Sequence, residues 1–193
     1  MSENILSGRA LLPTHMYFTT ATGEHPRELQ AHDLMYMEAG LGRVNRVQVS
    51  SRVPPGCTLI PAELGGRLLQ DGQILFAIQA LARTNEPGAR IATAVGVAVP
   101  EDGSVGCVAE VHEDDSQGKN AQEARDKAVQ MALTAMALEW GDPHFDALAA
   151  YSPGAQEYLI DGRRVFVHSA AAEATGPANG DFVKIVAALV FLF

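Results

Sequence analysis

The sequence has 193 residues, of which 47% are hydrophobic and 19% charged, which suits one folded domain and excludes a disordered chain. The formal net charge of −9 argues against nucleic-acid and anionic-membrane partners, because both are usually bound through basic patches. The two cysteines, Cys57 and Cys107, show no metal-ligand or redox spacing, and the N-terminal residues lack a signal-peptide pattern. These features favour a protein of the reducing cytoplasm.

The first predicted elements are a short helix and an alternating strand. Residues 31–40 favour a helix that ends at Gly40, the residue type that best tolerates a left-handed helix end. Residues 44–51 alternate between the two faces as a strand does. Pro54 and Pro55 follow, and they cannot continue a central strand because proline has no backbone N–H to donate.

Three further strands are predicted in the middle of the chain, over residues 73–81, 90–100 and 105–112. The second of these carries mostly β-branched residues on one face and only alanine and glycine on the other. Small side chains throughout one face indicate that another layer packs closely against it.

The second half of the chain predicts a long helix, a hairpin and a buried strand. The helix covers residues 120–141 and begins with a capping box formed by Asn120 and Glu123. Residues 157–168 favour a hairpin, and residues 181–193 are so apolar that they favour a central strand. Because strands outnumber helices and do not alternate with them one for one, we predict an α+β fold. The expected architecture is a layered αββα sandwich that forms a single domain over the whole chain.

A pair of serines, Ser50 and Ser51, lies at the end of the second predicted element, just before the two prolines. Taken alone, such a pair is most often a strand end with two turn-forming hydroxyls. The alternative is that the peptide bond between the serines is itself a place where chemistry happens.

The residues around this pair resemble the cleavage segment of the pyruvoyl-dependent arginine decarboxylase family. In that family a Gly-x-x-Asn sequence leads through a strand to Ser-Ser, with Pro-Pro shortly after. The matching residues of "AGLGRVNRVQVSSRVPPG" are Gly42, Asn45, Ser50, Ser51, Pro54 and Pro55. The similarity covers roughly three quarters of the chain, fades over residues 142–181 and returns faintly in the last strand.

The resemblance implies a pyruvoyl-dependent L-arginine decarboxylase that produces agmatine and CO2. Its cofactor would be a covalent pyruvoyl group made from Ser51, whose hydroxyl attacks the carbonyl of Ser50 and opens the chain there. The products would be a small β chain, residues 1–50, and a large α chain, residues 51–193. Residue 51 would then form a Schiff base with the substrate amine. We expect strain at the cut bond, held by the rigid strand and prolines around it.

The catalytic acid of the family corresponds to Glu110, which would return a proton to the substrate carbon after CO2 leaves. Glu110 shares a strand face with Val108, which is unusual for a charged side chain without a task. The alternative interpretation is a glutamate on a solvated strand face.

Two more residues correspond to active-site residues of the family: Asn45, and Asp33 as the anion that binds the substrate guanidinium. Asn45 and Ser51 lie roughly 20 Å apart along an extended strand, so one strand cannot bring both into a single pocket. The family's homotrimer, with sites between subunits, would resolve this. Without the resemblance, Asn45 fits a strand-start amide that satisfies backbone groups, and Asp33 fits a helix-start aspartate favoured by the helix dipole.

Other interpretations stay open at this point. The same chemistry could act on another amino acid, although pyruvoyl aspartate decarboxylases are shorter and cut at Gly-Ser, and pyruvoyl histidine decarboxylases are much longer. An unprocessed homologue could instead be a binding or assembly protein. His112, His144 and His168 lack metal-site spacing, so no metal ion is expected. The expected partners are L-arginine, agmatine and the other copies in the trimer, with no nucleic acid and no membrane.

Overall fold

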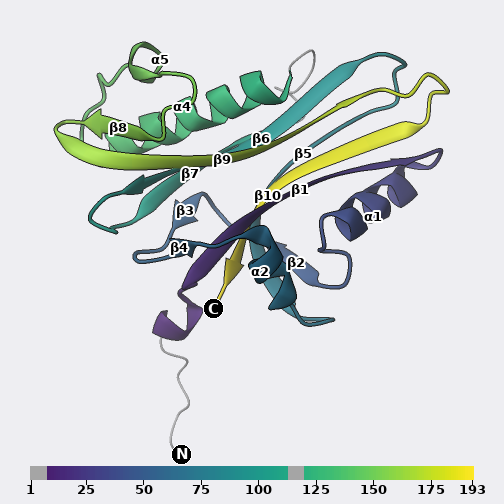
Figure 1. Cartoon of the computed structure of the whole chain (residues 1–193), viewed down its shortest axis with the longest axis horizontal. Coiled ribbons are helices and arrows are strands. Elements are labelled where there is room, and N and C mark those ends of the chain that lie inside the picture. The colour runs from purple at the N-terminus through teal and green to yellow at the C-terminus, as the bar shows by residue number, and fades with distance from the viewer. Residues whose placement is uncertain (1–7, 113–119) are drawn as a thin grey trace, which may run out of the picture.

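The computed structural model describes residues 8–112 and 120–193. Two five-stranded sheets, called sheet A and sheet B, lie face to face, and a helix covers the outer face of each (Figure 1). α1 (Glu28–Glu38) packs on sheet A and α4 (Ala121–Glu139) packs on sheet B. The layers therefore run α1, sheet A, sheet B, α4, and the predicted α+β sandwich with αββα layers is confirmed.

Sheet A carries its strands in the order β2, β5, β10, β1, β4. These strands are β2 (Asn45–Gln48), β5 (Ile74–Thr84), β10 (Phe182–Leu192), β1 (His15–His25) and β4 (Thr58–Leu59). β10 pairs antiparallel with both β5 and β1, while β2 runs parallel to β5 and β4 runs parallel to β1. β10 is thus a central strand, as its apolar sequence predicts.

Sheet B carries its strands in the order β3, β7, β6, β9, β8, and all neighbours are antiparallel. These strands are β3 (Arg52–Val53), β7 (Gly106–Val111), β6 (Arg90–Pro100), β9 (Arg163–Thr175) and β8 (Glu157–Ile160). The predicted hairpin is formed by β8 and β9. Its turn residues Asp161 and Gly162 have φ angles of 48° and 72°, and such positive angles are what a type I′ turn requires.

α4 packs on the face of β6 that carries only alanine and glycine. A Cβ atom added to Gly96 would lie 2.5 Å from the backbone carbonyl carbon of Ala128, so the helix can approach this closely only over glycine. Ala92 and Ala94 on the same face lie with Ala124 and Ala128 in one buried cluster. The close layer that the sequence predicts against this face is therefore α4.

The predicted strand over residues 44–51 is shorter in the structure. β2 ends at Gln48, and the chain then leaves sheet A and enters sheet B, where β3 begins at Arg52. The two serines therefore lie in the crossing between the sheets and not within a strand. The strand is interrupted here, where its two ends pair with different sheets.

Three short elements complete the described chain: η1 (Gly8–Leu11), α2 (Ala62–Arg67) and α5 (Ala147–Ala150). These elements are absent from the predicted set, as are β1, β3 and β4. Over the described ranges, no helix is both long enough and apolar enough to cross a membrane.

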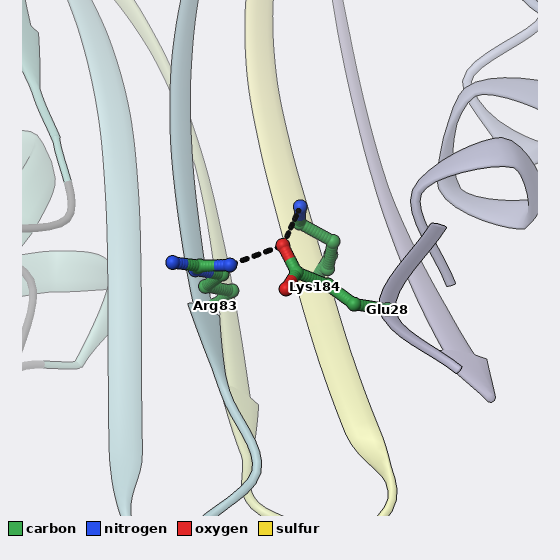
Figure 2. A network of polar contacts seen from close by, with 3 residues as sticks. All are labelled: Glu28, Arg83 and Lys184. Carbon is green, nitrogen blue, oxygen red and sulfur yellow. Dashed lines mark hydrogen bonds and ion pairs between the residues drawn. The ribbon is translucent and has the colours of Figure 1, made fainter. Parts of the chain in front are cut away.

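An ionic network fixes the beginning of α1 to sheet A, as Figure 2 shows. The Glu28 carboxylate accepts hydrogen bonds from Lys184 of β10, at 3.0 Å, and from Arg83 of β5. The bond from Lys184 and then the bond from Arg83 lower the pKa of Glu28. Because three elements meet in this network, it sets the orientation of α1, the helix that carries Asp33.

Candidate active site

Ser50 and Ser51 form a tight turn where the chain passes between the sheets. The backbone N–H of Arg52 donates a hydrogen bond of 2.8 Å to the carbonyl oxygen of Ser50, which closes a three-residue turn around Ser51. The carbonyl oxygen of Ser51 accepts a hydrogen bond of 3.1 Å from the N–H of Val108 in β7. Both carbonyl groups of the serine pair are therefore fixed by backbone donors.

The φ angles of the two serines lie outside the strained positive range, and the expected strain at the peptide bond itself stays a prediction. In the described ranges, Asp161 is the only residue other than glycine that has a positive φ. Ser50 and Ser51 therefore have negative φ angles that any residue can adopt. The fixed geometry of the turn comes from its hydrogen bonds and not from an unfavourable φ.

The Ser51 side chain points into the space between the sheets and meets Glu110. Its hydroxyl donates to the two carboxylate oxygens of Glu110, at 3.4 Å for Oε1 and 3.2 Å for Oε2. Glu110 pairs with Val95 of β6 and shares a face with Val108, and both valines belong to the buried core between the sheets. Glu110 is partly buried at the rim of this core and not on a solvated face. A strand inside the sandwich holds its carboxylate in one place, as proton transfer requires.

The next side chain, Arg52, points the other way, toward α4. Its guanidinium donates to Glu139 Oε2 at 2.5 Å and to Cys107 Sγ at 3.3 Å. Burial raises the pKa of the Cys107 thiol, and it raises the pKa of Cys57 to about 11. Both thiols therefore stay protonated and are poor nucleophiles. No group of three or more His, Cys, Asp or Glu residues within the described ranges could hold a metal ion.

An apolar cavity of about 260 Å³ opens beside Ser50. Its lining residues come from both sheets and from the two terminal segments: Leu11, Pro13, Val49, Ser50, Arg52, Pro54, Phe76, Phe191 and Phe193. Phe76 and Phe193 pack edge to face, with 5.6 Å between ring centroids. Such a wall suits the methylene groups of a long side chain.

Asn45 lies at the start of β2, and its hydrogen bonds go to residues outside the Ser51–Glu110 pair. Its side-chain amide donates to the carbonyl oxygen of Gly72 at 2.8 Å, and its backbone N–H donates to Gln73 at 2.8 Å. No hydrogen bond in the described part of the chain joins Asn45 to Ser51 or Glu110. A single protomer therefore does not bring Asn45 into the Ser51–Glu110 pair.

Asp33 also lies apart from the Ser51–Glu110 pair. It is exposed on α1, outside sheet A, whereas Ser51 and Glu110 face the space between the sheets. Its carboxylate makes no hydrogen bond or ion pair with any residue that the structure describes. Tyr36, on the same helix, is buried, and its hydroxyl donates to Gln79 at 2.8 Å.

Comparison with protein families gives a match over nearly the whole chain. The model of the family described as "Pyruvoyl-dependent arginine decarboxylase" matches residues 15–193. The matched range includes residues 142–181, where the resemblance by sequence alone fades. The relationship is therefore more extensive than the three quarters of the chain expected from the motifs.

Individual relatives agree with this result. The "Probable pyruvoyl-dependent arginine decarboxylase" of Chloroherpeton thalassium is 32% identical over 182 residues, which cover 94% of this chain and 98% of the relative. The "Pyruvoyl-dependent arginine decarboxylase 2" of Methanosarcina mazei is 33% identical over 184 residues, which cover 94% of this chain and 98% of the relative. A protein of the same name from Archaeoglobus fulgidus is 43% identical over 93 residues, which are 48% of this chain and 59% of the relative. The chain thus belongs to the pyruvoyl-dependent arginine decarboxylase family, and this membership makes it a decarboxylase with a covalently bound pyruvoyl group.

Proposed function

We propose that the protein cuts its own chain between Ser50 and Ser51 and then converts L-arginine to agmatine and CO2. The observation that carries this proposal is the contact between the Ser51 hydroxyl and the Glu110 carboxylate at the crossing between the sheets. The names of the relatives support arginine as the substrate.

The residues at the crossing fit a pyruvoyl group made from residue 51. Ser51 lies outside the ladder of β2, and its carbonyl is bound by Val108 of sheet B. A group formed there would stay attached to sheet B when the chain opens on the other side. When present, it supplies an electron sink for the loss of CO2 from an amino acid.

The cut would begin at the Ser51 hydroxyl. Its oxygen attacks the carbonyl carbon of Ser50, Glu110 accepts the hydroxyl proton, and the bond from that carbon to the Ser51 nitrogen breaks. The proton then passes from Glu110 to the released nitrogen, so that an ester replaces the amide. The Arg52 N–H, 2.8 Å from the Ser50 oxygen, is the donor that would stabilise the negative charge on this oxygen.

Elimination completes the cut. Removal of the α-proton of residue 51 expels the carboxylate of Ser50 and leaves a dehydroalanine at the new terminus. Addition of water and loss of ammonia then leave a ketone at residue 51. The products are residues 1–50, which keep β1, α1 and β2, and residues 51–193, which keep all five strands of sheet B.

In the second reaction Glu110 would act on the substrate. After CO2 leaves, a proton must return to the α-carbon, and a general acid beside residue 51 can supply it. Glu110 meets the geometric condition, since its carboxylate already contacts the side chain of residue 51. The apolar cavity beside Ser50 offers a surface for the methylene groups of arginine.

We place the arginine site between protomers of a homotrimer. This proposal rests on the positions of Asn45 and Asp33, which lie apart from the Ser51–Glu110 pair of their own protomer. The Asp33 carboxylate of a neighbouring protomer, which has no partner within its own described chain, would accept two N–H bonds from the planar guanidinium. The Asn45 amide of the neighbour would complete the same site.

The first experiment is an intact-mass measurement with an assay of CO2 release. The purified protein should give two masses, those of residues 1–50 and 51–193, and the larger piece should lack a free N-terminal amine. Arginine should release CO2, while lysine and ornithine should be poor substrates because an ammonium lacks the two-pronged guanidinium contact. A single intact chain without activity would instead identify a binding or assembly protein, and a clear preference for histidine would overturn the arginine assignment.

A further inference from the structure

Arg52, directly after the proposed pyruvoyl residue, is tied by its side chain to the end of α4. Its guanidinium binds Glu139 Oε2 at 2.5 Å. Arg52 pairs with Cys107 across β3 and β7, and Cys107 belongs to the core cluster beneath α4. The ion pair therefore lies on the α4 face of sheet B, opposite to the face on which the Ser51 hydroxyl meets Glu110.

The position of Glu139 is unfavourable for the helix alone. It is the last residue of α4, where the helix dipole disfavours a negative charge, and the last turn contains no basic residue. Arg52 supplies the missing positive charge from another element. The hydrogen bond to Glu139 is the largest of the interactions that raise the pKa of Arg52.

The cut changes how residue 51 is held. In the uncut chain it lies between β2 on one side and β3 on the other. In the cut chain it is the first residue of the large piece, so it is held only through its own carbonyl, which binds Val108, and through Arg52, which follows it. The ladder between β3 and β7 has only two residue pairs, and the prolines that follow have no N–H to extend it.

We propose that the Arg52–Glu139 ion pair anchors the new terminus of the large chain and keeps residue 51 aligned with Glu110. This inference rests on the proposed self-cleavage. Arg52 and Glu139 are positioning residues, because their side chains lie on the opposite face from the reacting groups. Their side chains are 54% and 39% exposed, and such exposed pairs contribute little to overall stability. Small losses of alignment can nevertheless lower turnover strongly.

The test compares Arg52→Met and Glu139→Gln, which remove one charge each with little change of shape. Arg164→Met is the matched control, because it breaks a pair of similar exposure on sheet B, the 3.1 Å contact of Arg164 with Glu157. Turnover is measured per pyruvoyl group, so that incomplete cutting does not enter the result. We expect kcat to fall about tenfold in both test variants, and KM of Glu139→Gln, which does not line the cavity beside Ser50, to stay within about twofold of wild type. The double variant Arg52→Glu with Glu139→Arg should regain most of this loss.

A second readout is independent of activity. Amide hydrogen exchange over residues 52–57 of the cut protein should be faster in Arg52→Met and Glu139→Gln than in wild type and Arg164→Met. Wild-type kcat and exchange in both test variants would overturn the anchor while leaving the proposed function intact. If the double variant regains no kcat, the anchor is overturned too, because the loss in the single variants would then not come from the charge pair. An uncut wild-type chain would overturn the proposed self-cleavage and this inference together.

Discussion

The two halves of the candidate site are assembled differently. Ser51 and Glu110 meet within one protomer, because the chain crosses between the sheets at Ser51 and β7 presents Glu110 to the same space. Asn45 and Asp33 stay apart from that pair, one at the start of β2 and the other on a helix outside sheet A. The comparison separates two tasks. One protomer holds both groups that are proposed to cut the chain, whereas the proposed recognition of the substrate would need a second protomer.

The largest expected effect is that of Ser51→Ala. Without the hydroxyl no ester can form, so the chain should stay uncut and decarboxylation should be absent. A denaturing gel and an assay of CO2 release from arginine measure both results. Ser50→Ala, which keeps the attacking hydroxyl and the attacked carbonyl, is the matched control and should still be cut. Cutting in Ser51→Ala would show that the chain opens elsewhere.

Glu110→Gln should lower kcat by about two orders of magnitude or more, the scale of losing a general acid. The amide can still bind the Ser51 hydroxyl, but it can neither accept the hydroxyl proton, so the cut should slow too, nor donate a proton to the substrate carbon. The measurement is kcat per pyruvoyl group, with Glu157→Gln on the opposite edge of sheet B as control. Unchanged turnover in Glu110→Gln would mean that the proton comes from another group.

Asp33→Asn probes the second half of the site and should lower kcat/KM for arginine by at least about tenfold, because a charge-assisted hydrogen bond contributes about 1.5–3 kcal/mol. Cutting of the chain should proceed as in wild type, since Asp33 does not contact the crossing. Glu38→Gln on the same helix is the control. If Glu38→Gln loses activity and Asp33→Asn does not, the guanidinium binds at Glu38.

The smallest expected effect is that of combining two variants in one oligomer. This experiment tests directly whether each site is shared between two protomers. Ser51→Ala lacks the reacting group, and Asn45→Ala lacks the amide that a neighbour would supply. Each variant alone should be inactive or weakly active. Coexpressed in equal amounts, they should form about one quarter intact sites if every site lies between two protomers. Activity no higher than the average of the two separate variants would place Asn45 outside the shared site.

The layers of the fold could be predicted because the spacing of apolar residues indicates which face of a helix or strand is buried. The small face of β6 predicts a close neighbour, and α4 lies there over Gly96. β1 was missed because its three threonines, a glycine and two histidines give an irregular burial pattern, with α1 covering only part of its outer face. A Cβ on Gly23 of β1 would lie 2.2 Å from the carbonyl oxygen of Ala31, so this glycine marks the approach of α1. A lone glycine in a polar stretch is too weak a signal to show this from sequence.

The candidate site was predicted in its residues but not in its geometry. The motif and the family resemblance point to Ser50, Ser51 and Glu110. The alternation over residues 44–51 suggested one strand, although pairing with two different sheets splits it at Gln48. Local periodicity carries no information about such pairing, because the partner strands are distant in sequence. For the same reason the tie between Arg52 and Glu139, separated by 87 positions, could not be seen.

The central place of β10 in sheet A has a consequence for biosynthesis. Among the described strands, β1 is made first and β10 last, yet the two pair along their whole lengths. β5 likewise gains its second neighbour only when β10 arrives. Until then sheet A lacks the strand between β1 and β5. The segment that crosses from sheet A to sheet B therefore starts from an incomplete sheet. The proposed cut would therefore follow the synthesis of β10, because one of the two sheets that hold the crossing is incomplete before that strand is made.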